Sequence, residues 1–254
     1  MKLIISPAKQ MVSDDEPLVS DDEPLVSPTP IRFPAQVTEL MADLKSRTPA
    51  ELQELWRCSD KLARENVARV QAFDLKRVGT PAVFAYAGIQ YQSLGAGVLT
   101  DRGLQNLGQR LYILSGLYGL LGAFDGILPY RLEMGAKGEI AGAKNLYQYW
   151  GARLYQALFA SGDLVVNLAS KEYSKAITPY LTPADRWVTV LFKQEKNGRL
   201  VQQATAAKQA RGSLVRYLAL ENEPTLATIK AFTVGGYRYR ADLSTEAEYV
   251  FVKD

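Results

Sequence analysis

The segment LYILSGLYGLLGAFDGILPYRLEMG, residues 111–135, places a short apolar run directly before a cluster of glycines. The run LYILS (111–115) is typical of a buried strand. Gly116, Gly119 and Gly122 follow it at intervals of three, although glycine is costly to order in either a helix or a strand. The segment is typical of a tight turn that leads into a helix, where glycines could bring backbone N–H groups close to an anion such as a DNA phosphate. The glycines alone favour the alternative, a close-packed turn without a ligand.

Around this segment, apolar runs alternate with amphipathic ones. Strands are predicted at 2–6, 81–88, 111–115, 164–170 and 248–253. Helices are predicted at 37–46, 49–57, 59–73, 145–160 and 206–222. The segment 186–205 is predicted to be a hairpin that turns at Asn197-Gly198, a dipeptide suited to a type I′ turn. No Pro- or Gly-rich linker divides this pattern, which predicts one α/β (mixed α+β) domain over residues 1–254, with helices flanking a mixed sheet.

The residue inventory excludes several classes of chemistry. The chain has 254 residues, no histidine and one cysteine, Cys58. An intrachain disulfide, a Ser-His-Asp triad, a histidine-ligated zinc site and a histidine-ligated haem are therefore excluded. We expect no cofactor, no tightly bound metal and no catalytic residue. The N-terminus is too quickly polar for a signal peptide and no apolar run is long enough to cross a membrane, so we expect a cytoplasmic protein with no membrane partner.

The net charge of +3 is unevenly distributed. The segment VSDDEPLVSDDEPLVS, residues 12–27, is a tandem repeat of VSDDEPL that carries six of the 27 acidic residues and no basic one. The rest of the chain then has 30 basic and 21 acidic residues. We interpret the repeat as a mobile acidic loop. The basic remainder favours an anionic partner such as nucleic acid, although many cytoplasmic proteins are basic for other reasons.

Polar residues follow several predicted strands. Because ligands commonly bind beyond the carboxyl ends of strands in α/β sheets, these residues could converge on one cleft: Lys9, Ser115, Asn167, Ser170 and Lys171. Ordinary solvated loops are the alternative.

Two further groups of charged residues could have either a structural or a binding role. Arg131 and Glu133 could form a structural ion pair. Lys208, Arg211 and Arg216 lie near one side of a predicted helix, where they could track phosphates or be solvated. The aromatic residues of LYQYW, residues 146–150, are interpreted as core rather than as a stacking surface.

Several short motifs, taken in order, resemble the YaaA family of peroxide stress proteins. They include IISPAK, SDKLA, LSGLYGLL, PYRLEMG and NLYQYWG. The resemblance extends over nearly the whole chain. It implies a single domain with a basic cleft and a helix-hairpin-helix element, binding to double-stranded DNA, and a role in the response to hydrogen peroxide. It also implies that the protein limits oxidative DNA damage and free intracellular iron, and it implies no defined reaction. We also expect unpaired or branched DNA as a partner.

The resemblance also suggests which residues bind DNA. Ser115 to Gly119 would form the hairpin of the helix-hairpin-helix element, with Gly116 and Gly119 closest to a phosphate. The residues implied to line the basic cleft are Lys9, Arg131, Lys171, Lys208 and Arg211. The chain departs from the pattern at YAGIQY, where Ile89 stands in the position of an acidic residue that some members carry.

Two other functions remain open from the sequence. An enzyme that acts on a DNA base or lesion could use Lys9 or Lys171 as an amine nucleophile beside Glu133 or Asp60. An iron-sequestering protein would need a site built from carboxylates and tyrosines, and no such cluster stands out beyond the acidic repeat.

Overall fold

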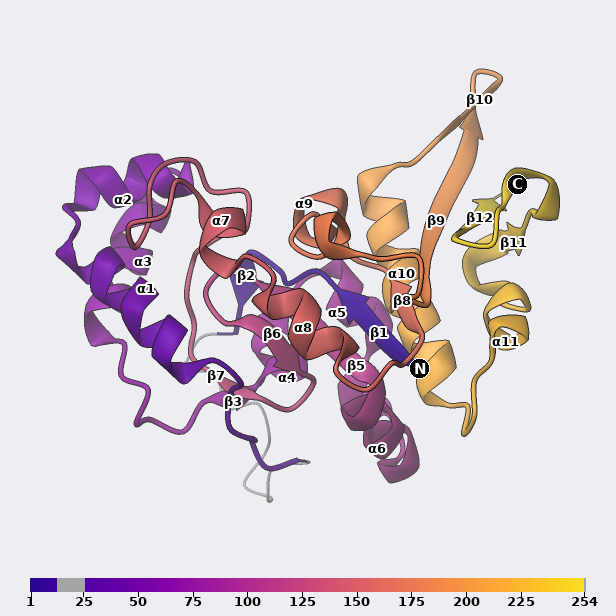
Figure 1. The fold of residues 1–254 in the computed structure, drawn as a ribbon, viewed down its shortest axis with the longest axis horizontal. Helices are drawn as coiled ribbons and strands as arrows, with labels where there is room; N and C mark the ends of the chain where they lie inside the picture. The colour runs from indigo at the N-terminus through magenta and orange to yellow at the C-terminus, as the bar shows by residue number, and fades with distance from the viewer. Residues whose placement is uncertain (13–25, 254) are drawn as a thin grey trace.

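A mixed β-sheet organises the computed structural model, which describes residues 1–12 and 26–253 (Figure 1). In the described residues the strand order is β11 (Tyr237–Tyr239), β12 (Glu248–Lys253), β9 (Trp187–Lys196), β8 (Val165–Asn167), β1 (Lys2–Ile5), β5 (Leu111–Ser115) and β6 (Gly119–Gly122). The strands from β12 to β5 run parallel to one another, whereas β11 and β6 pair antiparallel at the two edges. The predicted α/β class with a mixed sheet is confirmed.

Strand β1 lies in the middle of this sheet. Ile4 pairs with Tyr112 of β5 on one side and with Asn167 of β8 on the other. All of its residues are buried. A continuous apolar run is what a parallel strand covered on both faces requires, which explains why the sequence pattern identified it. The carboxyl ends of β1 and β8 therefore open at the same edge of the sheet.

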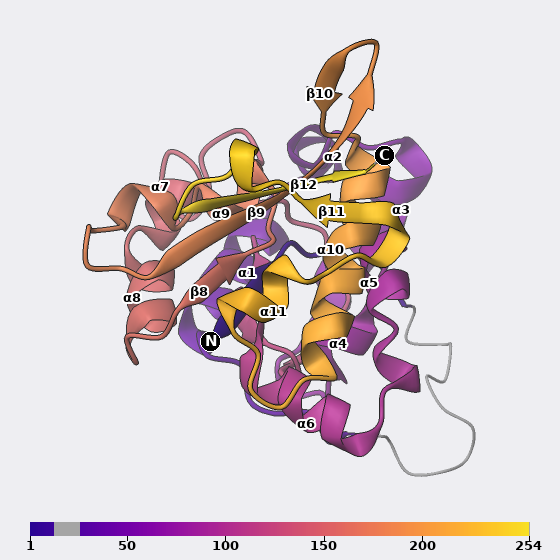
Figure 2. The ribbon, with the colours of Figure 1, turned by 90° about the vertical axis from the view of Figure 1, so that its right-hand side faces the viewer.

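Helices cover both faces of the sheet (Figure 2). On one side lie α10 (Ala204–Ala219), α5 (Ile89–Leu94), α6 (Asp101–Arg110) and α11 (Leu226–Lys230), and on the other lie α7 (Leu146–Trp150) and α8 (Arg153–Phe159). Helices α10 and α5 are in backbone contact at Gly212, where a Cβ atom would lie 2.0 Å from the carbonyl oxygen of Gln90. This close approach fixes the position of α10 relative to the loop after β1.

Three successive helices lie at one end of the molecule (Figure 1). They are α1 (Pro34–Ser46), α2 (Pro49–Trp56) and α3 (Asp60–Ala72), and they match the predicted helices closely. Pro49 begins α2, and Thr48 and Glu51 form a capping box there. The Tyr149 hydroxyl of α7 donates to the Gln36 carbonyl oxygen of α1 at 3.0 Å, which ties the two regions together.

The predicted strand 81–88 is wrong. The structure instead has two short bridging strands, β3 (Thr80–Pro81) and β4 (Tyr86–Ala87), separated by the helical turn α4 (Ala82–Ala85). β3 pairs with β7 (Gly126–Ile127) and β4 pairs with β2 (Gln10–Met11). The Ala82 amide donates a hydrogen bond to the Asp125 carbonyl oxygen, and the Val83 amide donates one to that of Ala123. These bonds hold the segment against the loop after β6, outside the main sheet. Tertiary contacts therefore override the apolar pattern.

The predicted helix 145–160 divides into two. Gly151, with φ 50° and ψ −139°, separates α7 from α8, a conformation that glycine adopts readily. The interpretation of LYQYW as core is confirmed for Tyr149 and Trp150, which are 8% and 0% exposed, whereas Tyr147 is partly buried.

The predicted hairpin is confirmed. β9 pairs antiparallel with β10 (Arg199–Val201), and Asn197 and Gly198 both have positive φ, as a type I′ turn requires. The hairpin projects from the body of the molecule (Figure 1). The predicted acidic loop falls largely on residues 13–25, which lie outside the described residues. Within residues 1–12 and 26–253, none of the helices is both long and apolar enough to cross a bilayer.

Candidate functional site

The turn at Ser115–Gly119 is not the hairpin of a helix-hairpin-helix element, and that prediction is wrong. The turn joins β5 directly to β6, and the two strands pair antiparallel with Ser115 opposite Gly119. The residues after Gly119 form an edge strand of the sheet instead of the helix that we expected.

The glycines of this turn serve close packing. A Cβ atom on Gly116 would lie 2.4 Å from the carbonyl oxygen of Leu132, and one on Gly119 would lie 2.7 Å from the ring of Trp150. Ser115, 0% exposed, accepts a hydrogen bond from the Tyr118 amide at 2.9 Å. Ser115, Gly116 and Gly119 are all buried, which corresponds to the alternative that we gave for this segment.

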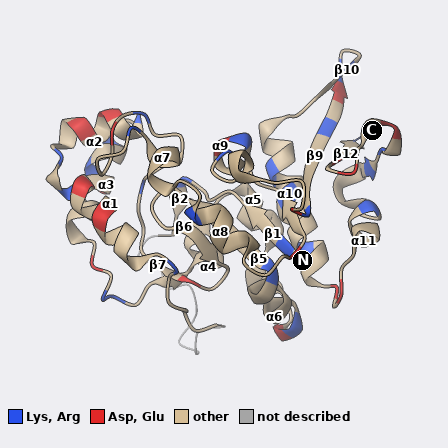
Figure 3. Cartoon of the chain, viewed as in Figure 1, with Lys and Arg blue, Asp and Glu red and all other residues tan. Residues whose placement is uncertain are grey.

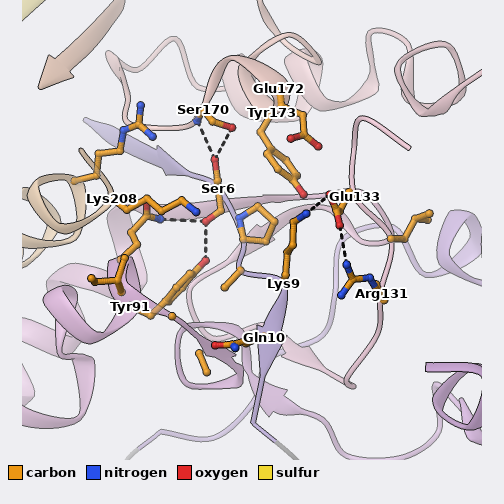
Figure 4. Close-up of a pocket in the computed structure, with 18 of the residues that line it drawn as sticks. Ser6, Lys9, Gln10, Tyr91, Arg131, Glu133, Ser170, Glu172, Tyr173 and Lys208 are labelled. Atoms are coloured by element: carbon orange, nitrogen blue, oxygen red, sulfur yellow. Dashed lines mark hydrogen bonds and ion pairs between the residues drawn. The ribbon is translucent and has the colours of Figure 1, made fainter. Parts of the chain in front are cut away.

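A pocket of about 520 Å³ opens instead beside the loop that follows β1 (Figure 4). Its wall consists of the loop 6–10, the start of α5, the segment 130–133, the start of α9 (Lys171–Ser174) and one face of α10. These segments are far apart in sequence, and they meet because β1 and β8 end at the same edge of the sheet. The pocket therefore occupies the place where open α/β sheets commonly bind ligands.

Ser6 is the centre of the hydrogen bonds that shape this wall. Its carbonyl oxygen accepts from the Tyr91 hydroxyl at 2.9 Å and from the Gln90 side chain at 3.1 Å. Its hydroxyl oxygen accepts from the Ser170 amide at 2.8 Å (Figure 4). The loops after β1 and β8 are thus joined, as we expected for Ser170, and α5 is fixed to both.

A chain of charged groups lies on the opposite side of the loop. Lys9 Nζ lies 2.9 Å from one carboxylate oxygen of Glu133, and Arg131 Nη2 lies 3.4 Å from the other (Figure 4). The Arg131 side chain is 10% exposed, whereas that of Lys9 is 64% exposed. The predicted pair of Arg131 and Glu133 is confirmed, although it lies on an irregular segment and also includes Lys9.

Helix α10 contributes Lys208 and Arg211 to the pocket. Lys208 is exposed and extends toward the Ser6 loop (Figure 4). Arg211 is 6% exposed, and its Nε atom is buried without a hydrogen-bond partner. Burial lowers the pKa of the Arg211 guanidinium from its ordinary value, and no carboxylate among the described residues counters that effect. The pocket thus has a buried positive charge in its wall.

Other predicted residues lie elsewhere. Lys171 is exposed at the start of α9, between the pocket residues Ser170 and Glu172, but is not part of the wall. The Asn167 side chain donates to Thr189 Oγ1 at 3.2 Å within the sheet. Asp60 is likewise outside the wall, where it accepts from the Gln53 side chain at 2.7 Å.

Arg216, the third basic residue that we placed on α10, also lies away from the pocket. Its Nη1 atom lies 3.5 Å from the Leu94 carbonyl oxygen and 3.4 Å from that of Gly95.

The sequence analysis missed three tyrosines that line the pocket: Tyr91, Tyr130 and Tyr173. Burial raises the pKa of Tyr130 to about 12 and raises the pKa values of Tyr91 and Tyr173 further. Their hydroxyl groups therefore remain protonated donors at neutral pH. The motif PYRLEMG does contain Tyr130, but nothing in its pattern distinguishes a pocket tyrosine from a core one.

Figure 3 shows several acidic segments on the helices α1 and α2 at one end of the molecule. The pocket brings together Lys9, Arg131, Lys208 and Arg211 with the carboxylates of Glu133 and Glu172. Glu172 accepts a hydrogen bond from the Gly135 amide at 2.9 Å. Among residues 1–12 and 26–253, no three His, Cys, Asp or Glu residues are grouped as a metal site would require. The expected absence of a tightly bound metal stays a prediction.

Comparison with known proteins gives consistent matches over the full length. A family model described as "Peroxide stress protein YaaA" matches residues 1–243. A "UPF0246 protein" of Limosilactobacillus fermentum is 96% identical over all 254 residues and over all of its own length. Proteins of the same name from Ligilactobacillus salivarius and Limosilactobacillus reuteri are 52% and 45% identical, over 100% and 99% of this chain and 100% and 98% of their own lengths.

Proposed function

The chain belongs to the peroxide stress protein YaaA family, and we propose that it binds double-stranded DNA through the basic pocket. In this proposal the protein acts in the cytoplasm during peroxide stress and helps to limit oxidative DNA damage and free intracellular iron. Unpaired or branched DNA would bind as well, because the contacts are made to phosphates and do not require paired bases.

The observation that supports this proposal best is the gathering of Lys9, Arg131, Lys208 and Arg211 around one opening. Glu133 neutralises part of the charge through its contacts with Lys9 and Arg131. Lys208 and Arg211 form no ion pair within the described residues, so their charges are available to a phosphate. Phosphate contacts of this kind supply most of the affinity of non-specific DNA binding.

The salt dependence of DNA binding tests the proposal. We would titrate a fluorescently labelled duplex with the protein at several salt concentrations and compare the parent with Lys208→Ala. Loss of one phosphate contact should lower the slope of log K against log salt by about 0.9. Arg102→Ala is the matched control, because Arg102 is exposed on α6 and is not part of the pocket wall. An absence of duplex binding, or the same slope change in both variants, would refute the proposal.

The same titration measures the affinity of the protein for different DNA structures. Duplexes of equal length with and without a central bubble, and a four-way junction, should all bind with a similar salt slope if phosphates carry the affinity. A purified protein that bound only one of these forms would show that base geometry, rather than phosphate charge, dominates.

One observation favours a second candidate function, an enzyme that acts on a DNA base or lesion. The amine of Lys9 lies 2.9 Å from the Glu133 carboxylate, which could accept the proton that an amine must lose before it attacks carbon. Borohydride would reduce the Schiff base and trap the protein covalently on a duplex with an abasic site. Trapping that disappears in Lys9→Met would establish this function, whereas no trapping in the parent would exclude it.

A further inference from the structure

We propose that the pocket holds a phosphate monoester, whose dianionic phosphate binds between Lys208 and Arg211 of α10. The ester could be a free mononucleotide or the phosphorylated 5′ end of a DNA strand, because both present the same group. The inference goes beyond duplex binding, since the phosphates inside a duplex are monoanionic diesters.

Arg211 is the first reason. Arg211 lines the pocket, although the residue is only 6% exposed. None of the described residues forms an ion pair with it or accepts a hydrogen bond from it, and its Nε atom has no partner. A buried charge without a counter-ion is strongly unfavourable, and arginine cannot avoid this by losing its proton. An anion in the pocket would supply the missing counter-charge.

The balance of charges around the pocket indicates a dianion. The carboxylate of Glu133 is shared by Lys9 and Arg131, and Glu172 accepts from the Gly135 amide. Lys208 and Arg211 remain without a carboxylate partner in the described part of the chain. They lie three positions apart on one helix and therefore on the same face. A monoester phosphate, whose second pKa is about 6, carries close to two negative charges at neutral pH and neutralises both.

The size and the lining of the pocket suit a nucleotide. Its volume of about 520 Å³ lies within the ordinary range for small-molecule sites. The buried rings of Tyr91, Tyr130 and Tyr173 line the same space, and aromatic rings are the side chains on which bases stack. The Tyr91 hydroxyl already donates to the Ser6 carbonyl oxygen, so the Ser6 loop is held in place before a ligand arrives.

The guanidinium geometry explains why α10 supplies an arginine here. Arginine presents a planar fork of N–H donors that matches two phosphate oxygens at once, whereas lysine presents a point charge. Helix α10 cannot shift away from the Ser6 loop without losing the contact that Gly212 makes with α5. The fork is therefore fixed on the scaffold, and Lys208 can adjust to the ligand.

Calorimetric titration of the full-length protein with deoxyadenosine monophosphate tests the inference, with inorganic phosphate and deoxyadenosine as companion ligands. The monophosphate should bind more than about tenfold tighter than deoxyadenosine, because only the former makes charged hydrogen bonds. Equal affinity for the nucleoside and the nucleotide would overturn the inference.

Two arginines of α10 give a matched pair of variants. Arg211→Met keeps the volume but removes the charge, and should weaken nucleotide binding by more than about tenfold without lowering the thermal stability of the free protein. Arg216→Met removes a guanidinium that contacts the Leu94 and Gly95 carbonyl oxygens, and should lower stability while binding stays within about twofold. Should Arg211→Met fail to fold, Lys208→Ala at the exposed position serves instead. Parent-like nucleotide affinity in Arg211→Met, or in Lys208→Ala where that replaces it, would overturn the inference.

DNA duplexes with different 5′ ends distinguish a phosphorylated strand end from a free mononucleotide as the source of the phosphate. A duplex with 5′ phosphates that binds tighter than the same duplex with 5′ hydroxyls identifies the strand end. Nucleotide binding without that preference identifies a free nucleotide, and the absence of both overturns the inference. Covalently closed circular DNA has no ends, so its binding reports on the proposed duplex function alone.

Discussion

The loops that follow β1 and β5 begin alike and end differently. The two strands are parallel neighbours, and a serine marks the end of each: Ser6 directly follows β1, and Ser115 is the last residue of β5. The loop after β1 leaves the sheet and lines the pocket, ending in the exposed Lys9. The chain after β5 folds straight back into β6, so Ser115, Gly116 and Gly119 are buried.

A strand end is therefore available to a ligand only where the chain moves away from it. An antiparallel return strand covers the carboxyl end of β5 and converts its glycines into packing residues. The loop that leads from β1 to β2 and the short helix α9 after β8 leave the ends of these two strands open. The same types of residue therefore predict a ligand site in one loop and a closed turn in the other.

The largest effect is expected for Gly116→Val. The new side chain would meet the Leu132 carbonyl oxygen, a backbone atom that cannot rotate away. We expect loss of at least about 3 kcal/mol of stability, at or beyond the usual upper end for an overpacked core. Gly97→Ala is the control, because a Cβ atom there has no neighbour within 4 Å. Urea unfolding measures both, and a Gly116→Val protein as stable as Gly97→Ala would show that the turn is not closely packed.

The next largest effect is expected at alkaline pH, which should lower the stability of the protein through the buried Tyr130 hydroxyl beside Ser115. The hydroxyl of Tyr130 is hydrogen-bonded to the Ser115 hydroxyl at 2.7 Å and to the Tyr86 hydroxyl at 2.8 Å. Burial raises the pKa of Tyr130 to about 12 from an ordinary value of 10.0. Above pH 10 the unfolded chain loses this proton and the folded chain does not. Stability should therefore be constant below pH 10 and fall above it, by about 1.4 kcal/mol per pH unit for this residue.

Urea midpoints on either side of pH 10 measure this slope, and Tyr130→Phe is the matched variant. Its slope should be shallower than that of the parent, because one buried titrating group is removed. Identical slopes would contradict the buried state of the Tyr130 hydroxyl.

Lys9→Met tests the open loop and should have a smaller effect on stability. The pair of Lys9 and Glu133 is largely exposed on the lysine side, and such pairs contribute about 1 kcal/mol or less. The substitution should change the urea midpoint little and still weaken duplex binding at low salt. A large loss of stability with unchanged binding would reverse the roles that we assign to the two loops.

Deletion of residues 19–25 should have the smallest effect. The segment is one copy of the acidic repeat, and its composition offers little to bury. We expect almost unchanged thermal stability and slightly tighter DNA binding, because three acidic residues are removed. A cooperative loss of folding in the melting curve would show that the repeat is structural.

The sequence predicted elements well where local pattern decides them. The buried strands β1, β5 and β12, the helix α10 and the turn at Asn197-Gly198 follow from apolar runs, periodicity and turn residues. The segment 81–88 was predicted wrongly because long-range backbone bonds to 123–125 decide its conformation.

For the candidate site, too, the sequence predicted what local motifs decide and missed what tertiary packing decides. Lys9, Arg131, Lys208 and Arg211 were named from their motifs and do line one pocket. The sequence could not show that Arg211 is buried or that Ser115 is covered, because both depend on how α10 and β6 pack. The pocket tyrosines were missed for the same reason.

The assignment of the anion site to the loop after β1, and not to the turn after β5, can be measured most directly by NMR. A short duplex with 5′ phosphates would be titrated into isotopically labelled protein while the backbone amide shifts are followed. We predict the largest shifts at residues 6–10 and 208–212, and small shifts at 116–119. Shifts concentrated at 116–119, or no shifts in either loop at saturating DNA, would contradict the account.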